Sequence, residues 1–90
     1  KVASAGHDGI AMAVRPAHTM VDGDTIFALS TGDAGAPADM LRICAAATLS
    51  VSAAIVAGVR RARGLAGIPA VTELTIGREE ARGGDGNGTA

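Results

Sequence analysis

Ninety residues are enough for one small domain, and the composition restricts the roles that such a domain can have. A net charge of −1 at pH 7 and a pI near 6.1 lack the basic character of nucleic-acid-binding proteins. Since Phe27 is the single aromatic residue, no platform exists for stacking bases, and we expect no nucleic-acid partner.

The first predicted element is a helix over residues 3–15 (ASAGHDGIAMAVR), where small residues predominate and the larger apolar residues leave one side that a helix can bury. Pro16 should end this helix, because the residue before a proline is biased away from the helical conformation. Residues 16–23 are then expected to form a loop that leads into the next element.

Residues 24–31 (DTIFALST) alternate between two sides, with Ile26 and Ala28 on one and Phe27 and Leu29 on the other. Both sides are apolar, which is typical of a strand that is covered on both faces. The pattern therefore predicts a β-strand in a layered α/β sandwich.

A long helix is predicted over residues 38–63, with Pro37 at its first helical position and Asp39 in its first turn. Apolar residues occur nearly all round it, so we expect a buried helix. The arginines of its last turn complement the helix dipole, and Gly64 is placed to cap its C-terminus.

The uncharged part of this helix, residues 43–59, is slightly shorter than the ~20 residues that cross a bilayer and is diluted by polar and small residues. We expect a packed helix rather than a membrane span. Much of the apolar content of the chain is alanine, which predicts that another chain or a further segment completes the core. Cys44 is the only cysteine, which fits a reducing compartment and predicts a cytoplasmic location.

After Gly67, residues 68–76 (IPAVTELTI) are rich in β-branched side chains and predict a short edge strand, with Pro69 near its start where a missing N–H is tolerated. Residues 77–90 contain many glycines and almost no apolar side chains. This composition predicts a disordered C-terminal tail.

Two histidines are candidates for chemistry. His7 and Asp8 are adjacent and could begin a metal site, although no second histidine follows at helical spacing and a surface or helix-packing role is the simpler interpretation. His18 is close in sequence to Asp22 and could act as a base or a hydrogen-bond partner. The alternative is a loop histidine that only orders its own turn.

Asp22 and Asp24 flank Gly23 at the start of the predicted strand. In an extended backbone, residues two apart lie about 6.5 Å apart with their side chains on the same side, so both carboxylates can act on one point. Two like charges at that spacing perturb each other's titration, which is useful for holding or sharing a proton. The alternatives are a polar turn and an oxygen-ligand site for a cation.

The stretch HDGIAMAVRPAHTMVDGDTIFALSTG, residues 7–32, resembles a segment in the smaller subunit of the self-processing aminopeptidases, the family of the L-aminopeptidase/D-amidase-esterases and the β-peptidyl aminopeptidases. Its DGDTIFALSTG part is most similar to the nylon-oligomer hydrolase branch and to uncharacterised actinobacterial peptidases beside it. The likeness covers the first third of the chain well, whereas the later helix and the IPAVTEL segment agree only in placement.

In that family a precursor cleaves itself, and the Ser or Thr exposed at the new N-terminus of the small subunit becomes the nucleophile. The resemblance implies a layered αββα sandwich of which this chain supplies only part, with residues 1–76 belonging to the small subunit. It also implies that Asp22 and Asp24 occupy the positions of two supporting residues, one an acid throughout the family and the other often a Ser. Asp24 would orient the nucleophile, and Asp22 would share its proton network.

Because the chain begins with Lys1, the resemblance places the nucleophile upstream of Lys1 and implies that this chain alone is inactive. The implied function is amide-bond hydrolysis of the aminopeptidase or amidase type on a peptide or amide substrate, with no metal or organic cofactor. The implied partners are the larger subunit of the same precursor and further αβ units in a higher oligomer. The alternative is a non-catalytic interaction domain whose DGD sequence is a turn or a cation-binding loop.

Overall fold

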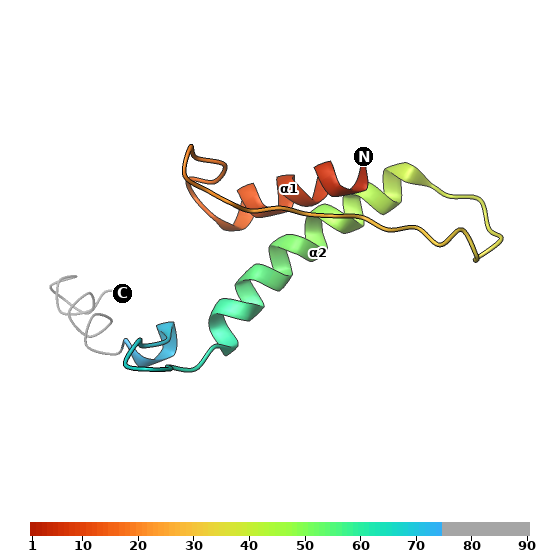
Figure 1. Ribbon diagram of the computed structural model, residues 1–90. Coiled ribbons are helices and arrows are strands. Elements are labelled where there is room, and N and C mark those ends of the chain that lie inside the picture. Colours follow the sequence, from red (N-terminus) through yellow and green to blue (C-terminus); the bar gives the residue numbers. More distant parts are fainter. Residues whose placement is uncertain (75–90) are drawn as a thin grey trace, which may run out of the picture. The chain divides into compact units, whose positions relative to one another are not determined.

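The computed structural model of the chain describes residues 1–74, which contain two α-helices and one 3₁₀-helix (Figure 1). Helix α1 spans Val2–Ala13, helix α2 spans Met40–Arg61 and the short helix η1 spans Val71–Glu73. The chain divides into two compact units, Lys1–Val56 and Ala57–Ala90, which are described separately.

Helix α1 confirms the first predicted helix and ends two residues before the predicted boundary. Val14 has an extended backbone, with φ −118° and ψ 123°, and its N–H still donates to the carbonyl of Ile10. Pro16 disfavours the helical conformation at Arg15, so the helix ends before that residue as expected, although this effect does not itself account for the extended backbone of Val14.

Helix α2 also forms, but its ends differ from those expected. Asp39 is the N-cap rather than a first-turn residue: its carboxylate accepts a hydrogen bond from the N–H of Arg42 at 3.2 Å, and its carbonyl accepts one from Ile43 at 3.0 Å. Pro37 therefore lies outside the helix. Gly64 lies three residues beyond Arg61 and has no positive φ, so the predicted glycine cap is wrong.

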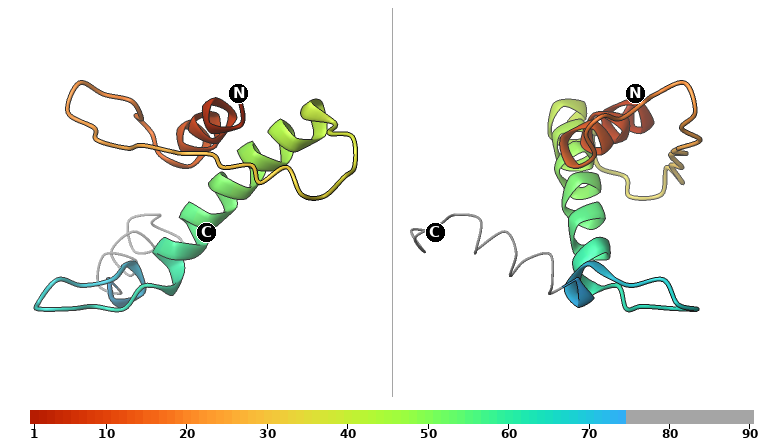
Figure 2. Two further views of the ribbon diagram at one scale, coloured as in Figure 1. Left: turned by 45° about the vertical axis from the view of Figure 1, so that its right-hand side comes forward. Right: turned by 90° about the vertical axis from the view of Figure 1, so that its left-hand side faces the viewer.

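Within the first unit, α1 lies across the N-terminal half of α2 (Figures 1 and 2). Gly6 and Gly9 are buried on the contacting side of α1. A Cβ atom on Gly9 would clash with the backbone carbonyl oxygen of Thr48 and lie 2.9 Å from the Cβ of Val51. The Thr48 hydroxyl donates at 2.9 Å to the carbonyl of Ala5, so the two backbones meet closely because small residues leave room between them.

The segment between the helices corrects the predicted strand. Residues 24–31 run extended beside α1 without pairing to another strand, and the described residues 1–74 contain no β-sheet (Figure 1). Ile26 is half-buried against Gly6, whereas Phe27 and Leu29 are 91% and 93% exposed. The expectation that both sides are covered is therefore wrong in this chain, where Ile26 alone of residues 24–31 is partly buried. A strand requires a neighbouring backbone for its hydrogen bonds, and none is present in this part of the chain.

The predicted αββα sandwich is therefore wrong for the described chain, which is helical. The predicted burial of α2 is also wrong, because none of its residues is buried. In length and composition α2 is sufficient to cross a membrane, a test that the core helices of many soluble proteins also pass. A low-bulk, alanine-rich chain of this size covers too little of its own apolar surface to bury such a helix.

The second unit begins with the end of α2 and replaces the predicted edge strand with a turn and η1. Leu65 and Ile68 exchange backbone hydrogen bonds of 3.0 and 2.9 Å, and Ala66 and Gly67 between them have φ values of 53° and 80°. Positive φ at both central residues is the geometry of a tight type I′ turn. The rest of the predicted strand, residues 75–76, and the predicted disordered tail, residues 77–90, lie outside the described residues.

Candidate functional site

The loop between α1 and the extended segment carries the two candidate carboxylates. Asp22 closes its own turn: its Oδ2 accepts a hydrogen bond from the N–H of Thr19 at 3.0 Å, and its N–H donates to the Thr19 carbonyl at 3.3 Å. This reciprocal pair is the local chemistry by which aspartate stabilises a turn. Asp22 therefore stabilises the turn, and its side chain is exposed.

These hydrogen bonds also set the charge of Asp22. The N–H of Thr19 lowers the pKa of the Asp22 carboxyl below that of an ordinary aspartate, because a donor to the charged form stabilises it, and the nearby His18 adds a smaller lowering. Asp22 is therefore a carboxylate throughout the neutral pH range. A fixed negative charge of this kind can attract a positively charged group.

Asp24 stands two residues further on, at the start of the extended segment, and its side chain is exposed. Between the two carboxylates, a Cβ atom placed on Gly23 would meet nothing within 4 Å. Gly23 has no positive φ, so the turn does not require a glycine here. The glycine instead leaves the backbone between Asp22 and Asp24 open to close approach by another group.

The two histidines, treated separately in the sequence, come together in the structure. His7 Nδ1 and His18 Nε2 are 3.0 Å apart, and the ring centroids are separated by 5.1 Å. His7 is half-buried on α1, while His18 is exposed at the start of the loop with a φ of 57°. Sequence reasoning missed this contact because the residues are eleven apart and meet only when the chain reverses after α1.

Asp8 does not join this pair, and no group of three or more histidine, cysteine, aspartate or glutamate side chains is placed to hold a metal ion among residues 1–74. The predicted start of a metal site at His7 and Asp8 therefore gains no further ligand from the described part of the chain.

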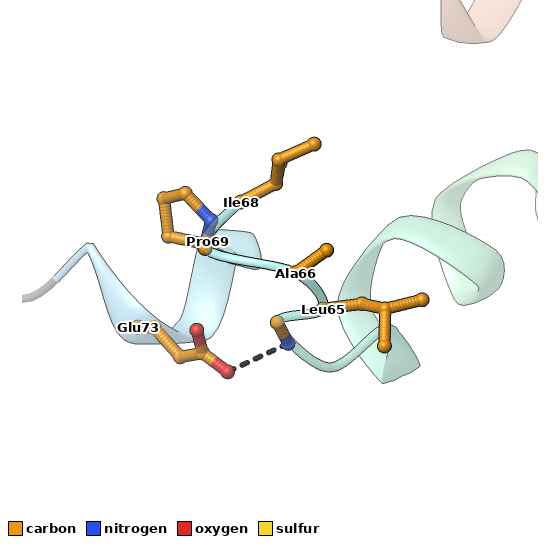
Figure 3. A pocket seen from close by; sticks show the side chains of 7 residues that line it. Leu65, Ala66, Ile68, Pro69 and Glu73 are labelled. Carbon is orange, nitrogen blue, oxygen red and sulfur yellow. Dashed lines mark hydrogen bonds between the residues drawn. The ribbon is translucent and has the colours of Figure 1, made fainter.

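Two surface hollows lie elsewhere. One, of about 560 Å³, is lined by residues 29–38 and Ile43. The other, of about 290 Å³, is formed by residues 64–69 and Glu73 (Figure 3). Glu73 spans this second hollow with its carboxylate, which accepts hydrogen bonds from Gly64 N–H at 2.8 Å and Ala70 N–H at 3.2 Å. Both carboxylate oxygens are thus engaged in holding the turn to η1, which is a structural role.

Comparison with known proteins shows which family the chain resembles. Residues 1–72 match peptidase family S58. Proteins named "uncharacterized aminopeptidase" from Mycobacterium tuberculosis and Mycobacterium bovis are 41% identical over 90 aligned residues, covering 86% of this chain and 26% of each relative. One from Mycobacterium leprae is 38% identical over 100 aligned residues, covering 97% of this chain and 28% of the relative.

The chain thus spans about a quarter of the length of the curated relatives that it matches. No solved structure matches it. The matched region includes α1, the loop with both aspartates, the extended segment and α2.

Proposed function

This chain belongs to peptidase family S58, and we propose that it is the part of a self-processing aminopeptidase or amidase that presents Asp22 and Asp24 to a nucleophile carried elsewhere. Membership of a peptidase family and the names of the relatives support a peptidase-type hydrolase. The observation that carries the finer proposal is the exposed DGD loop, which holds one carboxylate in a turn and the other at the start of an unpaired extended segment.

The proposed chemistry begins with a Ser or Thr at a new N-terminus upstream of Lys1. Its α-amino group takes the hydroxyl proton as the oxygen adds to the substrate's amide carbonyl, and the leaving amine receives that proton as the C–N bond breaks. Water then hydrolyses the acyl-enzyme. Asp24 would hold the ammonium or hydroxyl in the attacking orientation, and Asp22, whose charge the turn stabilises, would favour the positive charge that develops on the α-amine.

We propose that the partner is the larger subunit of the same precursor. Two features of the chain support this: Phe27 and Leu29 are almost fully exposed, and the extended backbone that carries them has no strand beside it in the described residues. Exposed large apolar side chains beside an unpaired backbone are suited to covering by another chain. Further αβ units would cover the exposed apolar residues of α2 in the same way, including Leu41 and Leu49.

The first test is the composition of the native protein. Intact-mass measurement and N-terminal sequencing of every chain in a purified native preparation should reveal a second, larger chain and a Ser- or Thr-initiated chain that contains this sequence. If the 90 residues are instead the whole native protein and it is a monomer, the proposal is wrong.

The second test separates the roles of the acids in the complete enzyme. Asp24→Asn keeps the size of the side chain and removes its charge, and we expect turnover of a peptide or amide substrate to fall by about 100-fold or more with the fold intact. Asp33→Asn is the matched control, because Asp33 is an exposed acid in a neighbouring loop of the same chain. Wild-type activity of both variants would remove Asp24 from the mechanism.

A non-catalytic interaction domain is the second candidate, and the turn closed by Asp22 is the observation in its favour. On that interpretation the DGD sequence only shapes the loop or binds a cation. Calorimetric titration with calcium distinguishes the cation version, and the absence of amidase activity in the complete assembly, with its folded state verified, would favour the turn.

A further inference from the structure

The contact between His7 and His18 joins the start of the DGD loop to α1. His7 is held by a regular helix that begins at Val2, while His18 lies in the loop after this helix and has a left-handed backbone. Their ring nitrogens are 3.0 Å apart, within hydrogen-bond distance, so one ring donates and the other accepts.

The backbone of His18 needs such an external contact. A φ of 57° is uncommon for a residue with a side chain and costs on the order of 1 kcal/mol or more, although histidine tolerates it better than bulky residues. A strained conformation of this kind persists where its surroundings determine it. The ring of His7 on one side and the turn from Thr19 to Asp22 on the other are the contacts that the structure provides.

The chain from this contact to the carboxylates is short and continuous. His18 is followed directly by Thr19, whose N–H and carbonyl both bind Asp22, and Asp24 is two residues beyond Asp22. A change in the direction of His18 therefore moves the Thr19 N–H and the carboxylate that it holds. Apart from the bond between the Val14 N–H and the Ile10 carbonyl at the helix end, no other hydrogen bond in the described residues connects α1 to this loop.

We propose that His7 is a positioning residue: through His18 it fixes the loop against α1 and so determines where Asp22 and Asp24 are presented. The expected effect of His7 on catalysis rests on the proposed function, whereas its expected effect on the position of the loop does not. A metal ion between the two rings is a poorer explanation, because two nitrogen ligands fall short of the three or four protein ligands of typical zinc sites.

Hydrogen exchange followed by mass spectrometry tests the effect on the loop in the complete protein. For His7→Ala we expect the peptide covering residues 16–24 to exchange about fivefold faster, which corresponds to the loss of one hydrogen bond. The peptide covering α1 should exchange as in the wild type, because alanine is a good helix former. His7→Gln, which keeps a group able to donate or accept, should give an intermediate rate.

Asp8→Ala is the matched control, since Asp8 is the exposed neighbour of His7 on α1. It should leave the exchange of both peptides unchanged. The proposal is overturned if His7→Ala leaves the 16–24 peptide at the wild-type rate, if it accelerates the α1 peptide equally, or if Asp8→Ala has the same effect.

Kinetics of the complete enzyme test the catalytic consequence. We expect His7→Ala to lower kcat about tenfold with KM within about twofold of wild type, and His7→Gln to recover part of kcat. An unchanged kcat with a more mobile loop would overturn the positioning role. If the wild-type assembly hydrolyses no amide substrate, the proposed function fails, and the exchange measurements still decide whether His7 fixes the loop.

Discussion

Two regions of the first unit differ in which residues they bury. One is the crossing of α1 and α2, and the other is the extended segment, residues 24–31. At the crossing, Gly6, Gly9 and Ala5 are buried although none of them has a large side chain. In the extended segment, Phe27 and Leu29 are more than nine-tenths exposed. Ile10 of α1 is buried as well. Apolar character alone therefore does not decide which residues of this unit are buried, since it leaves Phe27 and Leu29 exposed.

The two regions also differ in their polar contacts. At the crossing the Thr48 hydroxyl lies within hydrogen-bond distance of the carbonyls of Ala5 and Cys44, at 2.9 and 3.1 Å. Along residues 24–31 the hydrogen bond formed within the described chain is the one from the Thr25 hydroxyl to the Gly23 carbonyl, at 3.3 Å. The first region forms its polar contact within this chain, whereas the second leaves its backbone groups to water or to another chain.

The largest effect is expected at the crossing itself. Gly9→Ala places a methyl group against the backbone of α2, and we expect the free energy of unfolding to fall by about 2 kcal/mol because the helices must separate. Urea denaturation of the chain, followed by circular dichroism, measures this change. Gly58→Ala is the control: its Cβ would meet nothing within 4 Å, so it should stabilise α2 by up to about 1 kcal/mol.

The extended segment allows two adjacent residues to be compared. Ile26→Ala should lower the free energy of unfolding by about 1.5 kcal/mol, because Ile26 is half-buried and its Cδ1 lies near Gly6. Phe27→Ala should change it by less than about 0.5 kcal/mol, because Phe27 is exposed in the chain alone. Equal effects of the two substitutions in the same denaturation experiment would contradict the assignment of the two sides.

A smaller effect is expected from the hydrogen bond at the crossing. Thr48→Val keeps the shape of the side chain and removes its hydroxyl, and we expect a loss of about 1 kcal/mol in the free energy of unfolding. Thr48→Ser keeps the hydroxyl and should lose less. A valine variant as stable as the wild type would show that the close approach of the helices does not depend on this bond.

The smallest effect concerns the turn that precedes the extended segment. Since the folded-state pKa of Asp22 is lowered, the turn's stabilisation is fully present above the ordinary aspartate pKa of about 4 and is lost as the pH falls through the lower folded value. A carboxyl ¹³C titration should give a midpoint for Asp22 below that of an unstructured peptide. Thr19→Pro removes the donating N–H and should return the midpoint toward the ordinary value.

The helices were predictable from local features. A run of small residues ended by Pro16 predicts α1 over residues 3–15, and the start signal at Pro37 with the apolar run after it predicts α2 over residues 38–63, each within two residues of the observed ends. The resemblance of residues 7–32 to a self-processing aminopeptidase family agrees with the match to peptidase family S58. The roles given to Asp22 and Asp24 stay predictions, because they depend on a nucleophile that the described residues do not include.

Whether the two predicted strands form could not be decided from local features, because a strand exists only where another backbone completes its hydrogen bonds. The sequence by itself determined where helices form, which residues alternate along residues 24–31, and where the DGD loop begins. Only the tertiary structure decided that His7 meets His18, that Gly9 lies against Thr48, and that Phe27 faces outward. These outcomes depend on the direction in which the chain reverses after α1, and no local residue pattern encodes that direction.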